Sequence, residues 1–141
     1  MTTPLRPEFQ SELFQKGLGI RRQVVGEAYV ERSLASAEDF TAPLQKLITE
    51  WCWGEVWGRD GLDRRTRSFL NLGMLAALNR PHELRLHVQG ALNNGVTPTE
   101  IREVILQIAV YCGVPAALDA QRVAIEAIKA WVPETPADQR P

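Results

Sequence analysis

A histidine on an otherwise apolar helical face is the first residue whose type and position suggest chemistry. His87 lies in the segment 81–93. The apolar residues around it at helical spacing are Leu84, Val88 and Ala91. Arg80 and Glu83 share its face, and a carboxylate one turn before a histidine can orient the ring and support its charged form. The alternative is a histidine that only packs in the core.

A glutamate in an aromatic segment is the second candidate. Glu55 lies between Trp53 and Trp57. It continues a stripe at helical spacing formed by Leu44, Ile48 and Trp51. An aromatic, poorly hydrated setting disfavours the carboxylate, so Glu55 is a candidate acid that stays protonated near neutral pH. The alternative is a glutamate at a helix end that reaches solvent or pairs with an arginine.

Arginines gather between residues 59 and 85, where six of them stand against three acidic residues. They are Arg59, Arg64, Arg65, Arg67, Arg80 and Arg85. Because the planar guanidinium fork matches a carboxylate, the cluster suggests a local anion site. A solvated charged face is the alternative interpretation.

Other chemistries lack their sequence signals. There is no GxSxG turn, no HExxH and no glycine-rich phosphate loop. Cys52 and Cys112 stand far apart without CxxC or CxxH spacing, so no metal site is predicted, and both thiols are expected to be free, buried and structural. If the chain is an enzyme, its chemistry depends on acid–base groups and arginines.

The elements that position these residues are predicted to be helices throughout. The expected helices cover 8–24, 27–34, about 39–57 after a cap at Ser36, 64–79, 81–93, 98–112 and 116–131. Thr97, Pro98 and Glu100 have the pattern of a capping box, and the apolar run in 64–79 predicts a central helix buried on every side. No segment alternates as a strand does, so the predicted fold class is all-α.

The whole chain is predicted to form a single domain, residues 1–141, with its core at about 12–131 and a frayed tail at 132–141. The net charge of −1 gives no basic field for nucleic acid. No apolar run reaches the length of about 20 residues that spans a membrane, and no signal-peptide pattern is present. We therefore expect no nucleic-acid or membrane partner and a cytoplasmic location.

Five segments together carry a family resemblance. They are GLGIRRQVVGEAYV at 17–30, WGEVW at 53–57, ELRLH at 83–87, NNGVTPTEI at 93–101 and YCGVPAA at 111–117. In these segments the chain resembles the 4-carboxymuconolactone decarboxylases of the alkylhydroperoxidase-like superfamily, over about residues 12–131. The combination is more specific than NNGVT alone, which the wider superfamily shares.

The chain departs from the thiol peroxidases of that superfamily. Their helix carries CxxCxxxH with an upstream glutamate, and His87 corresponds to the histidine. Glu83 and Arg80 occupy the cysteine positions, and Ser68 occupies the glutamate position. Since a thiol peroxidase needs a thiolate nucleophile, that activity is not expected here.

The resemblance implies a compact helical bundle that assembles into trimers or hexamers, and cofactor-free decarboxylation of a five-membered lactone with two carboxylates in aromatic-acid catabolism. From chemistry and position, His87 would stabilise the oxyanion or deliver the proton, with Glu55 as its proton-transfer partner and Glu83 orienting the ring. The candidate substrate-binding residues are Arg80 and Arg85 first, then Arg64, Arg65 and Arg67, with Trp53 and Trp57. Alternatives are a related enzyme for another lactone or keto acid, and a non-enzymatic helical binding module.

Overall fold

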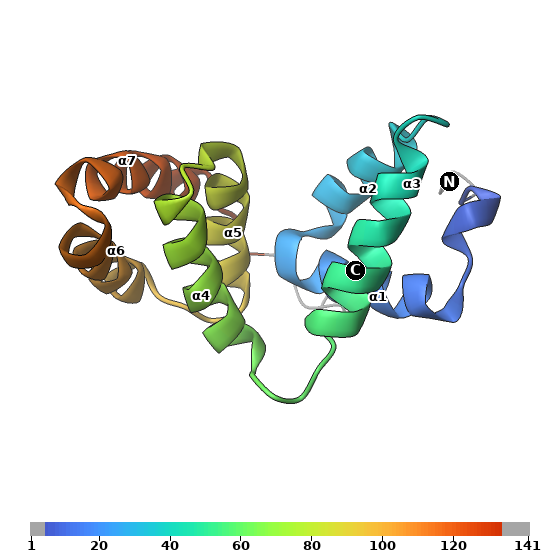
Figure 1. Ribbon diagram of the computed structural model, residues 1–141, viewed down its shortest axis with the longest axis horizontal. Coiled ribbons are helices and arrows are strands. Elements are labelled where there is room, and N and C mark those ends of the chain that lie inside the picture. The colour runs from blue at the N-terminus through green and yellow to red at the C-terminus, as the bar shows by residue number, and fades with distance from the viewer. Residues whose placement is uncertain (1–4, 134–141) are drawn as a thin grey trace. The chain divides into compact units, whose positions relative to one another are not determined.

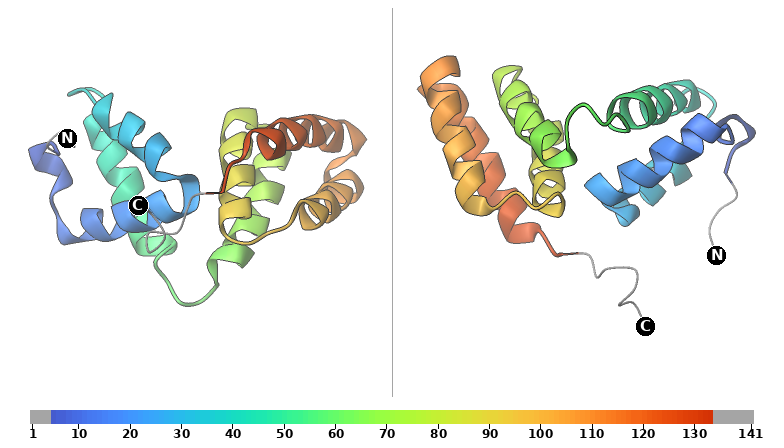
Figure 2. Two further views of the ribbon diagram at one scale, coloured as in Figure 1. Left: turned by 180° about the vertical axis from the view of Figure 1, so that it is seen from behind. Right: turned by 90° about the horizontal axis from the view of Figure 1, so that it is seen from below.

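The computed structural model describes residues 5–133, and every regular element in that range is a helix (Figure 1). This confirms the all-α prediction. The chain divides into two compact units, Met1–Leu62 and Asp63–Pro141, which are described separately below. Figure 2 shows the same helices from two further directions. None of the helices among the described residues is both long and apolar enough to cross a membrane.

The first unit contains five short elements. They are the 3-10 helix η1 (Pro7–Phe9), the α-helices α1 (Glu12–Val25), α2 (Glu27–Ala35) and α3 (Ala42–Leu47), and the π-helix η2 (Ile48–Val56). The helix predicted from residue 8 begins at Glu12 instead, because the side chain of Ser11 caps it by accepting from the amide of Phe14.

The helix predicted over about 39–57 differs from the structure in its start and its type. It begins at Ala42, and the hydroxyl of Ser36 donates to the carbonyl of Ser33, so Ser36 does not cap it. From Ile48 the hydrogen bonds widen to the π pattern, and the Trp57 amide donates to the Cys52 carbonyl at 2.9 Å.

The face of this helix that lies inside the first unit also differs from the prediction. Trp51 is 63% exposed and Leu44 is 60% exposed, whereas Thr49, Trp53 and Trp57 are buried. The stripe that leads to Glu55 therefore points outward in this unit.

The packing of α1 against η2 sets which face is buried. At Gly17 a Cβ atom would lie 1.9 Å from the carbonyl oxygen of Thr49, so only a glycine permits this approach. On the opposite helix, a Cβ atom at Gly54 would lie 2.8 Å from Cδ1 and 3.0 Å from the carbonyl oxygen of Leu13. The backbones of α1 and η2 thus touch through two glycines.

The second unit contains α4 (Arg64–Ala77), α5 (Pro81–Asn93), α6 (Pro98–Cys112) and α7 (Val114–Ala130). The capping box predicted for Thr97 and Glu100 is confirmed, and two further helix ends in this unit are also defined by local residues. Asp63 caps α4 by accepting from the Thr66 amide at 2.7 Å, and Thr97 and Glu100 form the full capping box of α6. Gly113, at φ 97°, separates α6 from α7.

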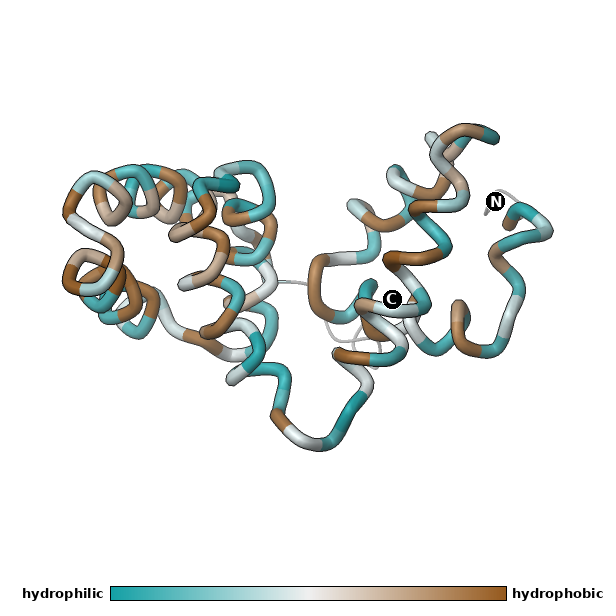
Figure 3. The backbone as a smooth tube through the Cα atoms, viewed as in Figure 1, coloured by the Kyte–Doolittle hydropathy of each residue, from teal (hydrophilic) through white to brown (hydrophobic). Residues whose placement is uncertain are grey.

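One apolar cluster fills the second unit between its helices. Its fully buried members include Leu72, Val88, Ile101 and Ala127, one from each helix. Along each helix of this unit, hydrophobic residues recur between hydrophilic ones (Figure 3). The prediction that 64–79 is buried on every side is wrong, because Leu70 and Met74 are exposed on the outer face of α4.

The end of the second unit is fixed by a side-chain hydrogen bond. The indole nitrogen of Trp131 donates to Oδ1 of Asn93 at 2.8 Å, which ties the chain after α7 to the end of α5. The tail predicted to be frayed, 132–141, falls outside the described residues from position 134 onward.

Candidate functional site

A line of polar side chains runs between α4 and α5 in the second unit. Ser68 and Asn71 lie on one face of α4, where they meet His87 on α5 and Asn94 directly after α5. We call these four residues the α4–α5 polar seam. The two residues of α4 are three positions apart and the other two are seven apart, which are spacings of neighbours on one helical face.

His87 meets Asn71 across the seam. Nδ2 of Asn71 lies 3.3 Å from Nδ1 of His87. His87 is half-buried, and this burial lowers the pKa of its imidazole to about 4, while the nearby Glu83 raises it only in part. At neutral pH His87 is therefore uncharged, and the predicted support of its charged form by Glu83 is overcome by desolvation. Glu83 itself is exposed.

The far end of the seam is a closed pair. The side-chain amide of Asn94 donates to Oγ of Ser68 at 2.9 Å and to the carbonyl oxygen of Arg64 at 3.4 Å. Ser68 is fully buried at the position where the thiol peroxidases carry a glutamate. In this chain the position holds a neutral hydroxyl that accepts a hydrogen bond from Asn94.

Two of the candidate substrate-binding arginines are paired with carboxylates inside the second unit. Arg65 forms an ion pair with Glu100, and its guanidinium carbon lies 5.2 Å from the centre of the Phe69 ring. Arg85 lies 3.5 Å from a carboxylate oxygen of Glu126. These contacts give both residues structural roles that the sequence did not indicate.

The other three arginines differ in their surroundings. Arg64 and Arg67 are half-buried on α4, one turn apart, beside the seam. Arg80 is exposed and donates to the carbonyl oxygen of Leu78 at 3.2 Å. Of the three, Arg64 and Arg67 lie nearest in sequence to Ser68 and Asn71 on the same helix.

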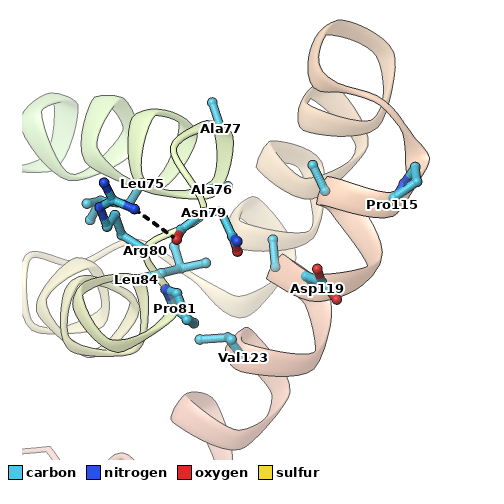
Figure 4. Close-up of a pocket in the computed structure, with 12 residues that line it drawn as sticks. Leu75, Ala76, Ala77, Asn79, Arg80, Pro81, Leu84, Pro115, Asp119 and Val123 are labelled. Carbon is cyan, nitrogen blue, oxygen red and sulfur yellow. Dashed lines mark hydrogen bonds between the residues drawn. The ribbon is translucent and has the colours of Figure 1, made fainter.

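Arg80 borders a cavity of about 140 Å³ between α4, α5 and α7, shown in Figure 4. Most of its lining is apolar, with polar groups from Asn79, Arg80 and Asp119. A wider apolar groove of about 430 Å³ lies between α4 and α6 and includes Phe69, Leu70 and Tyr111. His87 lines neither of them, so the two cavities are separate from the Asn71–His87 pair.

The tryptophan segment belongs to the first unit. The rings of Trp53 and Trp57 stack with centroids 4.9 Å apart and are buried, whereas Glu55 is exposed in this unit. The expected enclosure of Glu55 by these rings is therefore not found within the first unit. Glu55 and His87 lie in different units, and their proton-transfer partnership stays a prediction.

A buried arginine in the first unit was not singled out from the sequence. Arg21 is 4% exposed, and its Nη1 donates to Oε1 of Gln45 at 3.0 Å and to Oγ1 of Thr49 at 3.2 Å. Burial lowers the pKa of this guanidinium, and the hydroxyl of Tyr29 partly offsets the effect. The available signal was its helical spacing from Gly17, Leu18 and Val25, which are all buried.

Both cysteines are free, and only Cys52 is partly buried. Cys52 is half-buried, and burial raises the pKa of its thiol against the opposing charge of Arg21. Cys112 is exposed, which corrects the expectation that both are buried. Between residues 5 and 133 no cluster of three or more His, Cys, Asp or Glu side chains is arranged to hold a metal ion.

The fold and site together define an all-helical protein whose candidate centre combines a neutral histidine with side-chain amides. The chain belongs to the carboxymuconolactone decarboxylase family, whose model matches residues 42–126. This confirms the resemblance found in the sequence.

Two characterised relatives carry different substrate names. The chain is 49% identical over 125 residues to a nitrosuccinic acid decarboxylase, npaB, of Metarhizium robertsii, covering 89% of this chain and 87% of the relative. It is 44% identical over 116 residues to a 4-carboxymuconolactone decarboxylase of Acinetobacter baylyi, covering 82% and 87%. An uncharacterised 15.0 kDa protein of Paracoccus denitrificans is 31% identical over 127 residues, covering 88% of this chain and 92% of the relative.

Proposed function

We propose that this protein is a decarboxylase for a small dianionic acid whose carbanion is delocalised onto oxygen. The first candidate substrate is 4-carboxymuconolactone, and the second is nitrosuccinate, which the 49% identity to a nitrosuccinic acid decarboxylase favours. The observation that carries the proposal is a neutral histidine that contacts Asn71, in a member of this family.

The two candidate substrates share one reaction. The bond from carbon to a carboxylate breaks, carbon dioxide leaves, and the electron pair stays on carbon. In the lactone this pair is delocalised onto the ring carbonyl as a furan oxyanion; in nitrosuccinate it is delocalised onto the nitro group as a nitronate. A proton then binds carbon, and the second carboxylate is unchanged in both products. The substrate supplies its own electron sink, so we propose that no cofactor is needed.

The neutral imidazole of His87 suits the developing oxyanion. A neutral ring keeps one N–H group that can donate to the oxygen on which charge accumulates, without first pairing with the substrate's carboxylates as a cation would. Removing a well-placed donor of this kind typically lowers the rate by about 10²–10³. Glu55 is proposed to hold the proton that reaches carbon.

Arginines are proposed to bind the carboxylates of the dianion. Arg64 and Arg67 are the first candidates, because they are half-buried on the helix that carries Asn71. Arg65 and Arg85 already have carboxylate partners, which makes them weaker candidates. Arg80 stays a candidate through its exposed position at the start of α5.

We also propose that the protein acts as a homo-oligomer, a trimer or a hexamer. Large apolar side chains are exposed on the second unit, among them Leu70, Met74, Val110 and Tyr111. Exposed apolar area of this kind is typical of surfaces that a further copy covers. Light scattering coupled to gel filtration tests this, and a monomer at micromolar concentration would contradict it.

The test of the function is decarboxylation of each acid by the purified protein after treatment with a chelator. Freshly generated 4-carboxymuconolactone and nitrosuccinate are supplied separately, and the released carbon dioxide is trapped and counted. Turnover of one acid with a kcat/KM at least tenfold above the other identifies the substrate. Failure of the folded protein to release carbon dioxide from either acid would contradict the proposal.

A further inference from the structure

We propose that Asn71 is a positioning residue that holds the proton of His87 on Nε2, so that Nε2–H is the donor that meets the substrate. The role of Nε2–H toward the substrate rests on the function proposed above, whereas the assignment of the tautomer does not. The inference concerns a neutral amide that none of the sequence motifs described above includes.

The geometry of the pair points to one tautomer. The atom of Asn71 that faces His87 is the amide nitrogen, 3.3 Å from Nδ1. An amide nitrogen carries two N–H donors and no acceptor, so Nδ1 must accept and cannot carry a proton. A neutral imidazole has a single N–H group, and in His87 this group is therefore on Nε2.

The packing around the pair fixes this geometry. Leu72, the residue after Asn71, is 2% exposed, and Val88, the residue after His87, is 1% exposed. Both belong to the apolar cluster of the second unit, so neither helix can turn about its axis without exposing it. Asn71 also follows the fully buried Ser68 by one turn, and Ser68 is held by Asn94 at the end of α5.

The hydrogen bond should shift the tautomer and the turnover number by similar factors. A net contribution of about 1 kcal/mol, typical of one hydrogen bond, corresponds to a roughly fivefold change in a tautomer ratio. Replacing Asn71 by leucine, which is similar in size, should therefore mix the tautomers. We expect kcat to fall by up to about fivefold while KM changes less than about twofold, because the ground-state contacts to the carboxylates are retained.

The Asn71→Asp variant tests the direction of the bond. A carboxylate accepts only, so the aspartate introduced by this substitution would require Nδ1 to carry a proton and would favour the opposite tautomer or the imidazolium. The matched control is Gln121→Glu, which places the same charge on an exposed position of α7. We expect this control to leave the His87 resonances and the turnover number unchanged.

The experiment is a long-range proton–nitrogen correlation spectrum of the full-length protein labelled at histidine nitrogens, recorded near neutral pH. The chain has two histidines, and the His82→Asn variant assigns the pair of resonances that belongs to His87. We expect Nδ1 of His87 in the unprotonated range and Nε2 in the protonated range. In Asn71→Asp the pattern should reverse or average toward the charged form.

The outcomes separate this inference from the proposed function. A wild-type spectrum with the proton on Nδ1 overturns the inference, whatever the activity. The expected spectrum in a protein that decarboxylates neither acid supports the tautomer and contradicts the function. A turnover number for Asn71→Leu that equals the wild type, in a variant with altered tautomers and unchanged circular dichroism, overturns the positioning role.

Discussion

Asn71 on α4 and His87 on α5 meet through their side chains, with 3.3 Å between Nδ2 and Nδ1. This contact joins two helices whose other facing residues are mostly apolar and buried. Burial keeps the ring neutral, and the amide determines which nitrogen accepts. The candidate centre is thus a hydrogen-bond donor, and it is not the positively charged acid that the Glu83 spacing favoured.

The pH dependence of kcat distinguishes these two states of His87. Since burial lowers the pKa of His87 to about 4, the neutral ring persists well below the ordinary histidine range. We predict a kcat that is flat from about pH 7.5 to 5.5 and falls below about pH 4.5, as the ring gains its proton. A kcat that rises as the pH falls through 6.5 would indicate a charged catalytic acid instead.

The same pKa difference predicts a loss of stability in acid. Folding lowers the pKa of His87 from 6.5 to about 4, so between these values the unfolded chain binds more protons than the folded one. The contribution of the neutral His87 ring to the free energy of unfolding is fully present above pH 6.5 and is lost as the pH falls towards 4. Between about pH 7 and 4.5 the wild type should lose on the order of 2 kcal/mol more free energy of unfolding than His87→Leu does.

Urea unfolding at the two pH values measures this difference. The control is His82→Leu, which removes the exposed histidine of α5 and should retain the pH dependence of the wild type. Equal pH dependence in the wild type and in His87→Leu would mean that His87 does not titrate with a lowered pKa.

Two glycines of α1 give opposite predictions for the same substitution. A Cβ at Gly17 would lie 1.9 Å from the carbonyl oxygen of Thr49, so Gly17→Ala should separate α1 from η2 and cost about 3 kcal/mol or more. A Cβ at Gly19 meets nothing within 4 Å, so Gly19→Ala should stabilise the protein by about 0.5–1 kcal/mol. Thermal unfolding of both variants checks the pair, and similar melting temperatures would contradict the close approach of the two helices.

The proposed partnership of Glu55 and His87 predicts coupled kinetic effects. If both groups act in one proton transfer, Glu55→Gln and His87→Leu should each lower kcat, and the double variant should lose little more than the worse single one. The control pair is Glu50→Gln, from the same π-helix, with His87→Leu. Here the effects should multiply, since Glu50 already contacts Lys46 and Ser11. If the effects of Glu55→Gln and His87→Leu on kcat also multiply, the two residues do not act in one proton transfer.

The features that the sequence predicted most reliably are those that depend on residues close together in the chain. The capping box of Thr97 and Glu100 and the cap at Asp63 depend on residues within one turn, and both are present. Helical periodicity identifies the stripe through Leu44 and Trp51 as one face, but it does not say whether another helix covers that face, and in the structure both residues are exposed. The burial of Thr49 depends on Gly17, which lies on a different helix far earlier in the chain.

In the candidate site, too, some features can be predicted from neighbouring residues, whereas others depend on contacts between helices. His87 was identifiable because a titratable residue on an apolar face is conspicuous, whereas Asn71 is a neutral amide whose role appears only when α4 meets α5. The arginine cluster was identified as a group, but the partner of Arg65 is Glu100, on another helix. Arg21 was missed although it shares a helical face with buried residues, because its hydrogen-bond partners Gln45 and Thr49 lie on other helices.

The most direct test of the central claim is the kcat of His87→Leu on whichever acid the wild type decarboxylates. Leucine fills the half-buried position without an N–H donor, and the melting temperature and circular dichroism establish that the variant is folded. We predict a kcat about 10²–10³ lower than that of the wild type, with a smaller change in KM. A folded variant with a kcat within about threefold of the wild type would contradict the assignment of His87 as the donor to the oxyanion.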